Sequence, residues 1–160
     1  MSDAGMSKIV RTIASVSFPF VLIYGLYIIA HGHLTPGGGF QGGAVVASGC
    51  AMILIAYGSS WILTKTKEHH ISLLEHAGAL GFIGLAFLGL LLGGVFFANF
   101  IIGEPILFGS APALGSTLAD INTGGVLPLM NFAVGLKVIA GLFSIILVMA
   151  YASGHKEGIQ

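Results

Sequence analysis

Long runs of apolar residues alternate with shorter polar connections along the chain. Crossing the roughly 30 Å hydrocarbon layer takes about 20 helical residues. Four runs are long enough and carry few charges, and they cover residues 12–30, 42–63, 73–100 and 128–151. Each run is continuously apolar, whereas the strands of a membrane β-barrel alternate over about ten residues. The pattern predicts an all-α membrane protein with four transmembrane helices, and we expect residues 1–160 to form a single integral membrane domain.

Basic residues outside the runs are confined to three segments. They lie before the first run, between the second and third, and after the fourth: Lys8, Arg11, Lys65, Lys67 and Lys156. The other two connections contain no Lys or Arg. Because short cytoplasmic loops are enriched in Lys and Arg, both termini are predicted to be cytoplasmic in a multi-pass protein of the cell membrane. We expect the first run to be retained rather than cleaved as a signal sequence, because it ends in GLYIIAHGH instead of small residues.

Composition excludes several classes of function. The chain has 160 residues, of which 56% are hydrophobic and 8% charged, with zero formal net charge and a mean hydropathy of +0.99. A neutral chain lacks the positive field that nucleic-acid binding requires, so the lipid bilayer is the expected environment instead. The single cysteine, Cys50, excludes an internal disulfide and a multi-cysteine metal site within this chain. No nucleophile, base and orienting group occur at a plausible spacing, so we expect no catalytic site, metal or cofactor here.

The most unusual segment is HGHLTPGGGFQGGAVVASG at residues 31–49, between the first and second runs. Its Gly-x-Gly-x-x-Gly pattern does not indicate a nucleotide site, because that fingerprint requires a preceding strand and a crossover unit. Two interpretations remain open. The segment is a tight interhelical turn whose small residues allow close helix packing, or a broken-helix element in which Thr35 and Gln41 line a polar cavity. The residues that define this motif are Pro36, Gly37, Gly38, Gly39, Phe40, Gly42 and Gly43.

Lys137 is the sharpest functional signal among the ionisable residues. It lies deep in the fourth run, where a charge costs several kcal/mol unless it is paired or hydrated. The alternative is a structural lysine held against helix-end carbonyls. Glu75 opens the third run at the cytoplasmic end, so we expect it to lie too far from Lys137 for a salt bridge. Further candidates for an ion path are His31 and His33, which also fit an interfacial role, and Asp120 in the outer connection.

The run HGHLTPGGGFQGGAVVA, the plan of four spans and the later sequence PLMNFAVGLKVIAGLF occur together in this chain. In this combination the chain resembles the MnhB-like family, which supplies one of the small membrane subunits of the multisubunit cation/proton antiporters of the Mrp type. The resemblance covers residues 10–152. The same family also occurs in membrane-bound hydrogenases and in related sulfane-sulfur-reducing complexes that carry an antiporter-like sodium module.

This resemblance implies a non-catalytic membrane subunit that contributes to Na+ translocation and to assembly in a complex exchanging Na+ for H+. Its partners would be other membrane subunits of the antiporter. In a redox-driven alternative, hydrogenase-like iron-sulfur subunits would join them, and in a third alternative the chain is a scaffold without ion contact. Carried over by position, the functional candidates are the buried Lys137 and the loop residues Pro36, Gly37, Gly38, Phe40 and Gln41.

Overall fold

The computed structural model describes residues 5–104, 106–110 and 122–156, and within them the chain forms five α-helices. Four of the five are long and apolar enough to cross a membrane, and the third is a short helix of seven residues. No named strand occurs in the described part of the chain, so the predicted all-α class with four spanning-capable helices is confirmed. The helix bounds are Lys8–Ala30 for α1, Gly38–Tyr57 for α2, Ser59–Lys65 for α3, Glu68–Gly93 for α4 and Leu127–Lys156 for α5.

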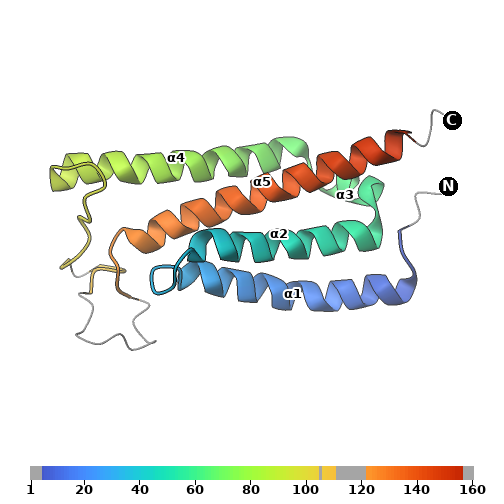
Figure 1. Ribbon diagram of the computed structural model, residues 1–160, viewed down its shortest axis with the longest axis horizontal. Helices are drawn as coiled ribbons and strands as arrows, with labels where there is room; N and C mark the ends of the chain where they lie inside the picture. Colours follow the sequence, from blue (N-terminus) through green and yellow to red (C-terminus); the bar gives the residue numbers. More distant parts are fainter. Residues whose placement is uncertain (1–4, 105, 111–121, 157–160) are drawn as a thin grey trace.

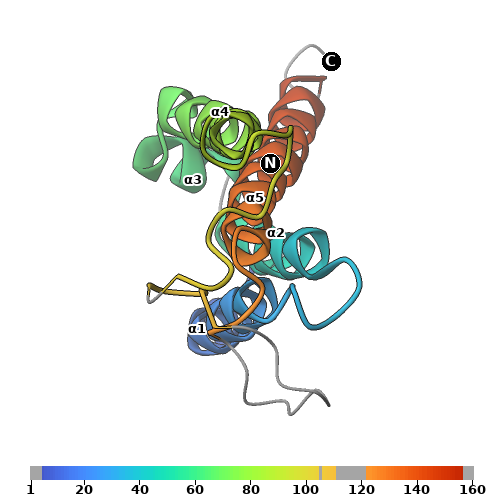
Figure 2. The same ribbon diagram turned by 90° about the vertical axis from the view of Figure 1, so that its left-hand side faces the viewer.

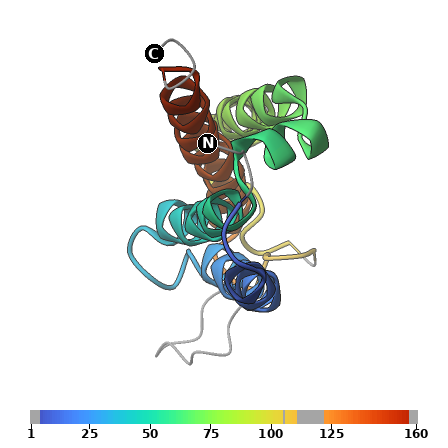
Figure 3. The ribbon, with the colours of Figure 1, turned by 90° about the vertical axis from the view of Figure 1, so that its right-hand side faces the viewer.

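The long helices form an open row rather than a closed bundle. Their order in space is α4, α5, α2 and α1, and each helix packs mainly on its neighbours in that order (Figure 2). Helices α1 and α4 run in one direction, while α2 and α5 run in the other (Figure 1). The beginning of α1 and the end of α5 consequently lie at one end of the molecule, which we call the terminal end and which faces the viewer in Figure 3. We call the opposite end, where α1 turns into α2, the loop end.

Helix α2 is pressed between α1 and α5. Of its most apolar stretch, 44% is buried inside the chain, against 17% for each of the other three spans. A methyl group added at Gly42 would lie 2.6 Å from the carbonyl oxygen of Gly25 in α1. One added at Gly43 would lie 2.9 Å from the carbonyl oxygen of Gly135 in α5. Only a hydrogen atom fits at these two positions, so the glycines let α2 approach two backbones at once.

The second predicted span is divided in the structure. Helix α2 ends at Tyr57, and Gly58 adopts a φ of 90° that turns the chain into α3, which ends at Lys65. The rings of Tyr57 and Trp61 stack across this break with centroids 4.5 Å apart. The prediction of one continuous helix to residue 63 is therefore wrong, because a glycine with positive φ interrupts the apolar run.

The third predicted span is displaced toward the N-terminus. Helix α4 begins at Glu68 and ends at Gly93, where Gly94 closes the last turn with a φ of 77°. The chain then folds back so that Ala98 lies against Gly93. The prediction that the helix continues to residue 100 is wrong for this reason, and the apolar residues after Gly94 belong to the connection between α4 and α5.

Asparagine side chains hold the described part of that connection. The Nδ2 atom of Asn99 donates to the carbonyl oxygen of Gly124 at 3.0 Å, and its Oδ1 accepts the N–H of Val126 at 2.8 Å. Asn122 accepts the N–H of Phe108 at 2.7 Å in the same way. Because Val126 directly precedes α5, Asn99 joins the region after α4 to the start of α5.

Substituting Gly43 by leucine is expected to destabilise the protein by about 2 kcal/mol or more, because the new side chain would force α2 and α5 apart. Gly84 of α4 offers a matched control, since a Cβ atom there would meet nothing within 4 Å. We expect Gly84→Leu to be neutral or slightly stabilising, because leucine is the better helix former. Thermal unfolding in mild detergent measures both variants, and equal melting temperatures would contradict the packing role of Gly43.

Asn99→Ala is expected to loosen the start of α5, since two hydrogen bonds worth about 0.5–1.5 kcal/mol each are lost. Hydrogen exchange at the Val126 amide measures this directly and should become faster. Asn99→Asp keeps the acceptor for that amide but loses the donor to Gly124, so its Val126 amide should exchange more slowly than in the alanine variant. Identical exchange in the wild type and in Asn99→Ala would show that this link does not hold the segment.

Candidate functional site

Lys137 lies in the middle of α5 with its side chain exposed. It lies ten positions after Leu127, the first residue of the spanning stretch Leu127–Ala152. At 1.5 Å per residue, it is about 15 Å from the nearer end of that stretch. Gly78 of α4 packs on the backbone of Lys137. A methyl group added at Gly78 would lie 2.8 Å from the backbone nitrogen of Lys137. The contact fixes the backbone of Lys137 on α4 and leaves the side chain at the surface of the chain.

Glu75 is an ionisable residue of the same interface between α4 and α5. Its side chain is half-buried, and a methyl group at Gly141 would lie 3.7 Å from its Oε1 atom. Gly141 follows Lys137 by one helical turn, so the carboxylate and the lysine lie about one turn apart along the contact between α4 and α5. Glu75 does not open the span as expected, because α4 starts earlier and carries it about two turns into the spanning stretch that begins at His69.

The two opposite charges form no direct ion pair. Neither Lys137 nor Glu75 has an ion pair within 4 Å among the described residues, which agrees with the expected separation. A lysine at the centre of a membrane helix costs about 2.5–3.5 kcal/mol on insertion scales, so this site requires a polar neighbour. Chemically, an ammonium group can bind a carboxylate or release a proton, and a carboxylate can take up a proton or contact a cation. No cluster of three His, Cys, Asp or Glu residues is present in the described ranges.

Glycines shape the turn between α1 and α2. Gly37 has a φ of 77°, a conformation that favours glycine, and it precedes the first turn of α2. Gly38 and Gly39 are buried, the first against the backbone of Gly32 and the second against Asn131. A methyl group at Gly39 would lie 2.8 Å from the Asn131 carbonyl oxygen. These contacts support the interpretation of the segment as a tight turn that allows close packing.

The polar and aromatic residues of the turn lie on the outside. Thr35, Pro36 and Gln41 are exposed, and Phe40 is 58% exposed. The backbone of Lys137 packs on α4 at the other side of α5, away from this turn. The structure therefore presents the turn and the lysine as two separate surfaces.

His31 and His33 lie at the loop end of α1. Nδ1 of His31 donates to the carbonyl oxygen of Tyr27 at 3.0 Å, and the two rings lie with centroids 3.9 Å apart. His33 lies against Gly124, where a methyl group would be 3.0 Å from its Cδ2 atom. These contacts fit the interfacial role, with His31 closing α1 and His33 joining it to the start of α5. Asp120 lies outside the described residues.

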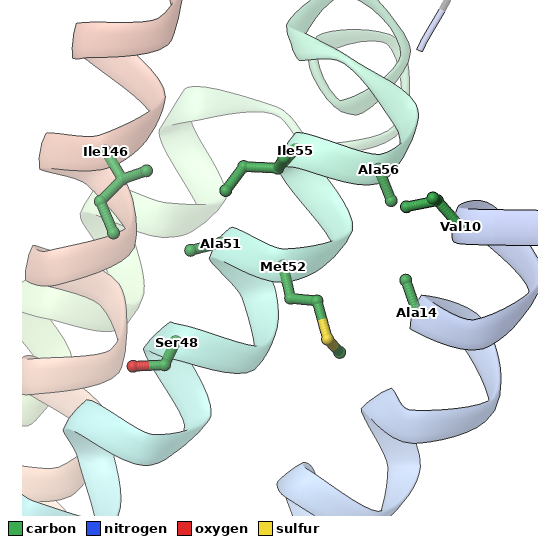
Figure 4. Close-up of a pocket in the computed structure, with 8 residues that line it drawn as sticks. All are labelled: Val10, Ala14, Ser48, Ala51, Met52, Ile55, Ala56 and Ile146. Atoms are coloured by element: carbon green, nitrogen blue, oxygen red, sulfur yellow. The ribbon is translucent and has the colours of Figure 1, made fainter. Parts of the chain in front are cut away.

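An apolar cleft of about 360 Å³ opens between α1, α2 and α5 (Figure 4). Val10, Met52 and Ile146 are among its lining residues, and Ser48 contributes a hydroxyl group. That hydroxyl donates to the carbonyl oxygen of Ala44 at 2.8 Å, so its proton is already used within α2. The lining suits an acyl chain or an apolar side chain rather than an ion.

Two residues of the site were not singled out by the sequence. Gly78 and Gly141 place Lys137 and Glu75 on one interface, Gly78 by direct contact and Gly141 by leaving room for the carboxylate. A signal was present, since each glycine follows an ionisable residue by three or four positions and so shares its helix face. Membrane helices contain many glycines, however, and the pairing of these two depends on how α4 and α5 cross.

Comparison with known proteins adds a family and two relatives. The family described as "Domain related to MnhB subunit of Na+/H+ antiporter" matches residues 9–144. An uncharacterized protein of Methanocaldococcus jannaschii is 37% identical over 144 residues, which cover 86% of this chain and 51% of that protein. A Na+/H+ antiporter subunit of Bacillus subtilis is 38% identical over 110 residues, which cover 64% of this chain and 66% of that protein. The chain thus spans only about half the length of the first relative.

The family match includes the glycine-rich turn, Glu75 and Lys137. It extends over four helices that are apolar enough to span a membrane, which makes an integral membrane protein the consistent interpretation. Because the match covers most of the chain, this protein belongs to the MnhB family, which is related to a subunit of Na+/H+ antiporters.

Proposed function

We propose that the protein is a non-catalytic subunit of a multisubunit Na+/H+ antiporter and that it contributes to Na+ translocation and to assembly. The observation that carries the proposal is the exposed Lys137 in the middle of a spanning helix, one turn from Glu75. Ionisable residues at such depth mark ion pathways or contacts inside membrane complexes, because lipid does not compensate their charge. An antiporter offers both kinds of environment.

The open row of helices supports a subunit rather than a self-sufficient transporter. Helix α4 packs on α5 at one end of the row, and α1 packs on α2 at the other. Within the described residues, such a row encloses no interior through which an ion path could run. A route for Na+ or H+ past Lys137 would therefore be lined partly by other membrane subunits of the complex.

The outer surface of the turn is proposed as a second point of contact in the same complex. Pro36 and Phe40 present apolar surface there, and Thr35 and Gln41 present polar groups. An ion entering from the loop end would meet these oxygens before it reached the depth of Lys137. His31 and His33, which follow α1, are proposed to contact the ion at the same end of the molecule. Asp120 lies outside the described residues and stays a proposed ion-path residue.

We place the terminal end in the cytoplasm of the cell. Both ends of the described chain lie at this end, as an even number of crossings requires. The basic residues Lys8, Arg11, Lys65 and Lys67 also belong to segments at this end, and the positive-inside rule favours their retention in the cytoplasm.

A purely structural role is the second candidate, because close packing alone explains the buried glycines of the turn. The two functions differ in what they require of Lys137, since a scaffold needs only its bulk. The similarity to an antiporter subunit of Bacillus subtilis favours an antiporter as the host complex over a redox-driven pump with iron-sulfur subunits.

Lys137→Met removes the charge and keeps the length of the side chain. We expect it to lower Na+-dependent proton exchange in everted vesicles by about tenfold or more, because a charge used in the ion path cannot be replaced by a thioether. Lys137→Arg should retain more exchange than Lys137→Met. Lys67→Met makes the same chemical change outside the spanning stretches and should leave exchange at the wild-type level. Wild-type exchange in Lys137→Met, at equal amounts of assembled complex, would favour the scaffold.

A further inference from the structure

One face of the α4–α5 pair combines charge with exposed apolar surface. On α5, Lys137, Gly141, Ile145 and Val148 follow one another at spacings of three or four residues and so share a helix face. Ile145 is 58% exposed and Val148 is 60% exposed. Glu75 of α4 borders this stripe beside Gly141. We call these five residues the α4–α5 face.

Lipid alone does not suit this face. The ammonium group of Lys137 is attached to a four-carbon stem, which is much shorter than the distance of about 15 Å to the nearer end of the spanning stretch. It cannot reach the headgroups by extending along the helix, so phosphate groups of lipids are excluded as its regular counter-charge. The compensating group must lie at the same depth in the membrane.

A second copy of this chain is a poor occupant of the face. Copies in one membrane share one orientation, so a symmetric dimer has its two-fold axis along the membrane normal and brings equivalent residues to the same depth. Two Lys137 ammonium groups would then approach each other in a medium of low dielectric constant, where like charges repel strongly. A different chain with a negative charge at that depth removes this conflict.

We propose that the α4–α5 face is the docking surface for a transmembrane helix of a different subunit, which carries an aspartate or glutamate opposite Lys137. One turn toward the terminal end, the same helix places a hydrogen-bond donor opposite Glu75. Gly141 leaves room for the Glu75 carboxylate, which lies 3.7 Å from the position of a methyl group there, and so keeps this negative group beside the stripe. The proposal rests on the proposed function only in requiring other membrane subunits.

The charges of the α4–α5 face select the orientation and register of the partner helix as well as attracting it. From the loop end to the terminal end the face presents a positive group and then a negative one, about one turn apart. A partner helix that presents a carboxylate and then, one turn closer to the terminal end, a hydrogen-bond donor fits this face. A helix shifted by one turn toward the terminal end would place its carboxylate against Glu75. Opposed like charges of this kind discriminate against wrong registers and wrong partners.

The test uses the complete complex in its own membrane. A photo-crosslinking amino acid is placed at Ile145 or Val148, and at Ile23 of α1 as a control that is 66% exposed at the opposite end of the row. We expect positions 145 and 148 to crosslink to one transmembrane helix of another subunit, with an aspartate or glutamate in its middle. We expect the control at Ile23 not to crosslink to that helix.

Charge reversal then tests the pairing itself. Lys137→Glu should lower co-purification of the crosslinked subunit by about tenfold or more, because two carboxylates would oppose each other. Lys137→Met should also lower it, because it leaves the partner's carboxylate unpaired. Exchange of the partner's carboxylate for lysine should restore co-purification of Lys137→Glu. This reciprocal rescue is not expected from a variant that merely misfolds.

Crosslinks to lipid alone, or to a helix without a carboxylate, would overturn the docking proposal. So would a Lys137→Glu variant that co-purifies with its partners as well as the wild type does. In either case the wild-type chain would still co-purify with antiporter subunits, and the proposed function would stand. A wild-type chain that co-purifies with no other subunit would contradict both proposals.

Discussion

The arrangement of this protein depends on backbone contacts that only glycine permits. Within a membrane, lipid is as apolar as the helices, so close packing and hydrogen bonds hold helices together instead of the hydrophobic effect. Gly42 and Gly43 bring α2 against α1 and α5, and Gly78 brings α4 against the backbone of Lys137. The spacing and order of the row follow from these three positions. A side chain at any of them would separate two helices and change every surface beyond.

The same contacts explain why the chain has an incomplete site. A row of helices leaves two broad faces uncovered, and the contact at Gly78 brings Lys137 to the edge of one of them. The lysine lies within a helix that is apolar enough to span a membrane, and it has no ion pair within 4 Å among the described residues. In the proposed complex, assembly and ion handling are linked, because a group of another subunit would compensate the charge of Lys137.

The sequence predicted the number of helices that are long and apolar enough to span a membrane, because that number depends on the length of apolar runs. It did not predict where two of the helices end. Gly58 and Gly94 stop helices by adopting positive φ, whereas Gly84 lies inside α4, and hydropathy does not distinguish these conformations. The position of Glu75 was misjudged because α4 begins at Glu68, before the apolar run that predicted the span. Which face exposes Lys137 is decided by the crossing of α4 and α5, a tertiary property.

The most direct test of a role in a larger complex is to purify the tagged chain from native membranes in mild detergent and to identify the proteins that accompany it by mass spectrometry. We expect several other membrane subunits of a cation/proton antiporter in fixed proportion to this chain. Additional iron-sulfur subunits would place the same chain in a redox-driven pump instead. Recovery of the chain alone, under conditions that preserve other membrane complexes, would contradict its role as a subunit.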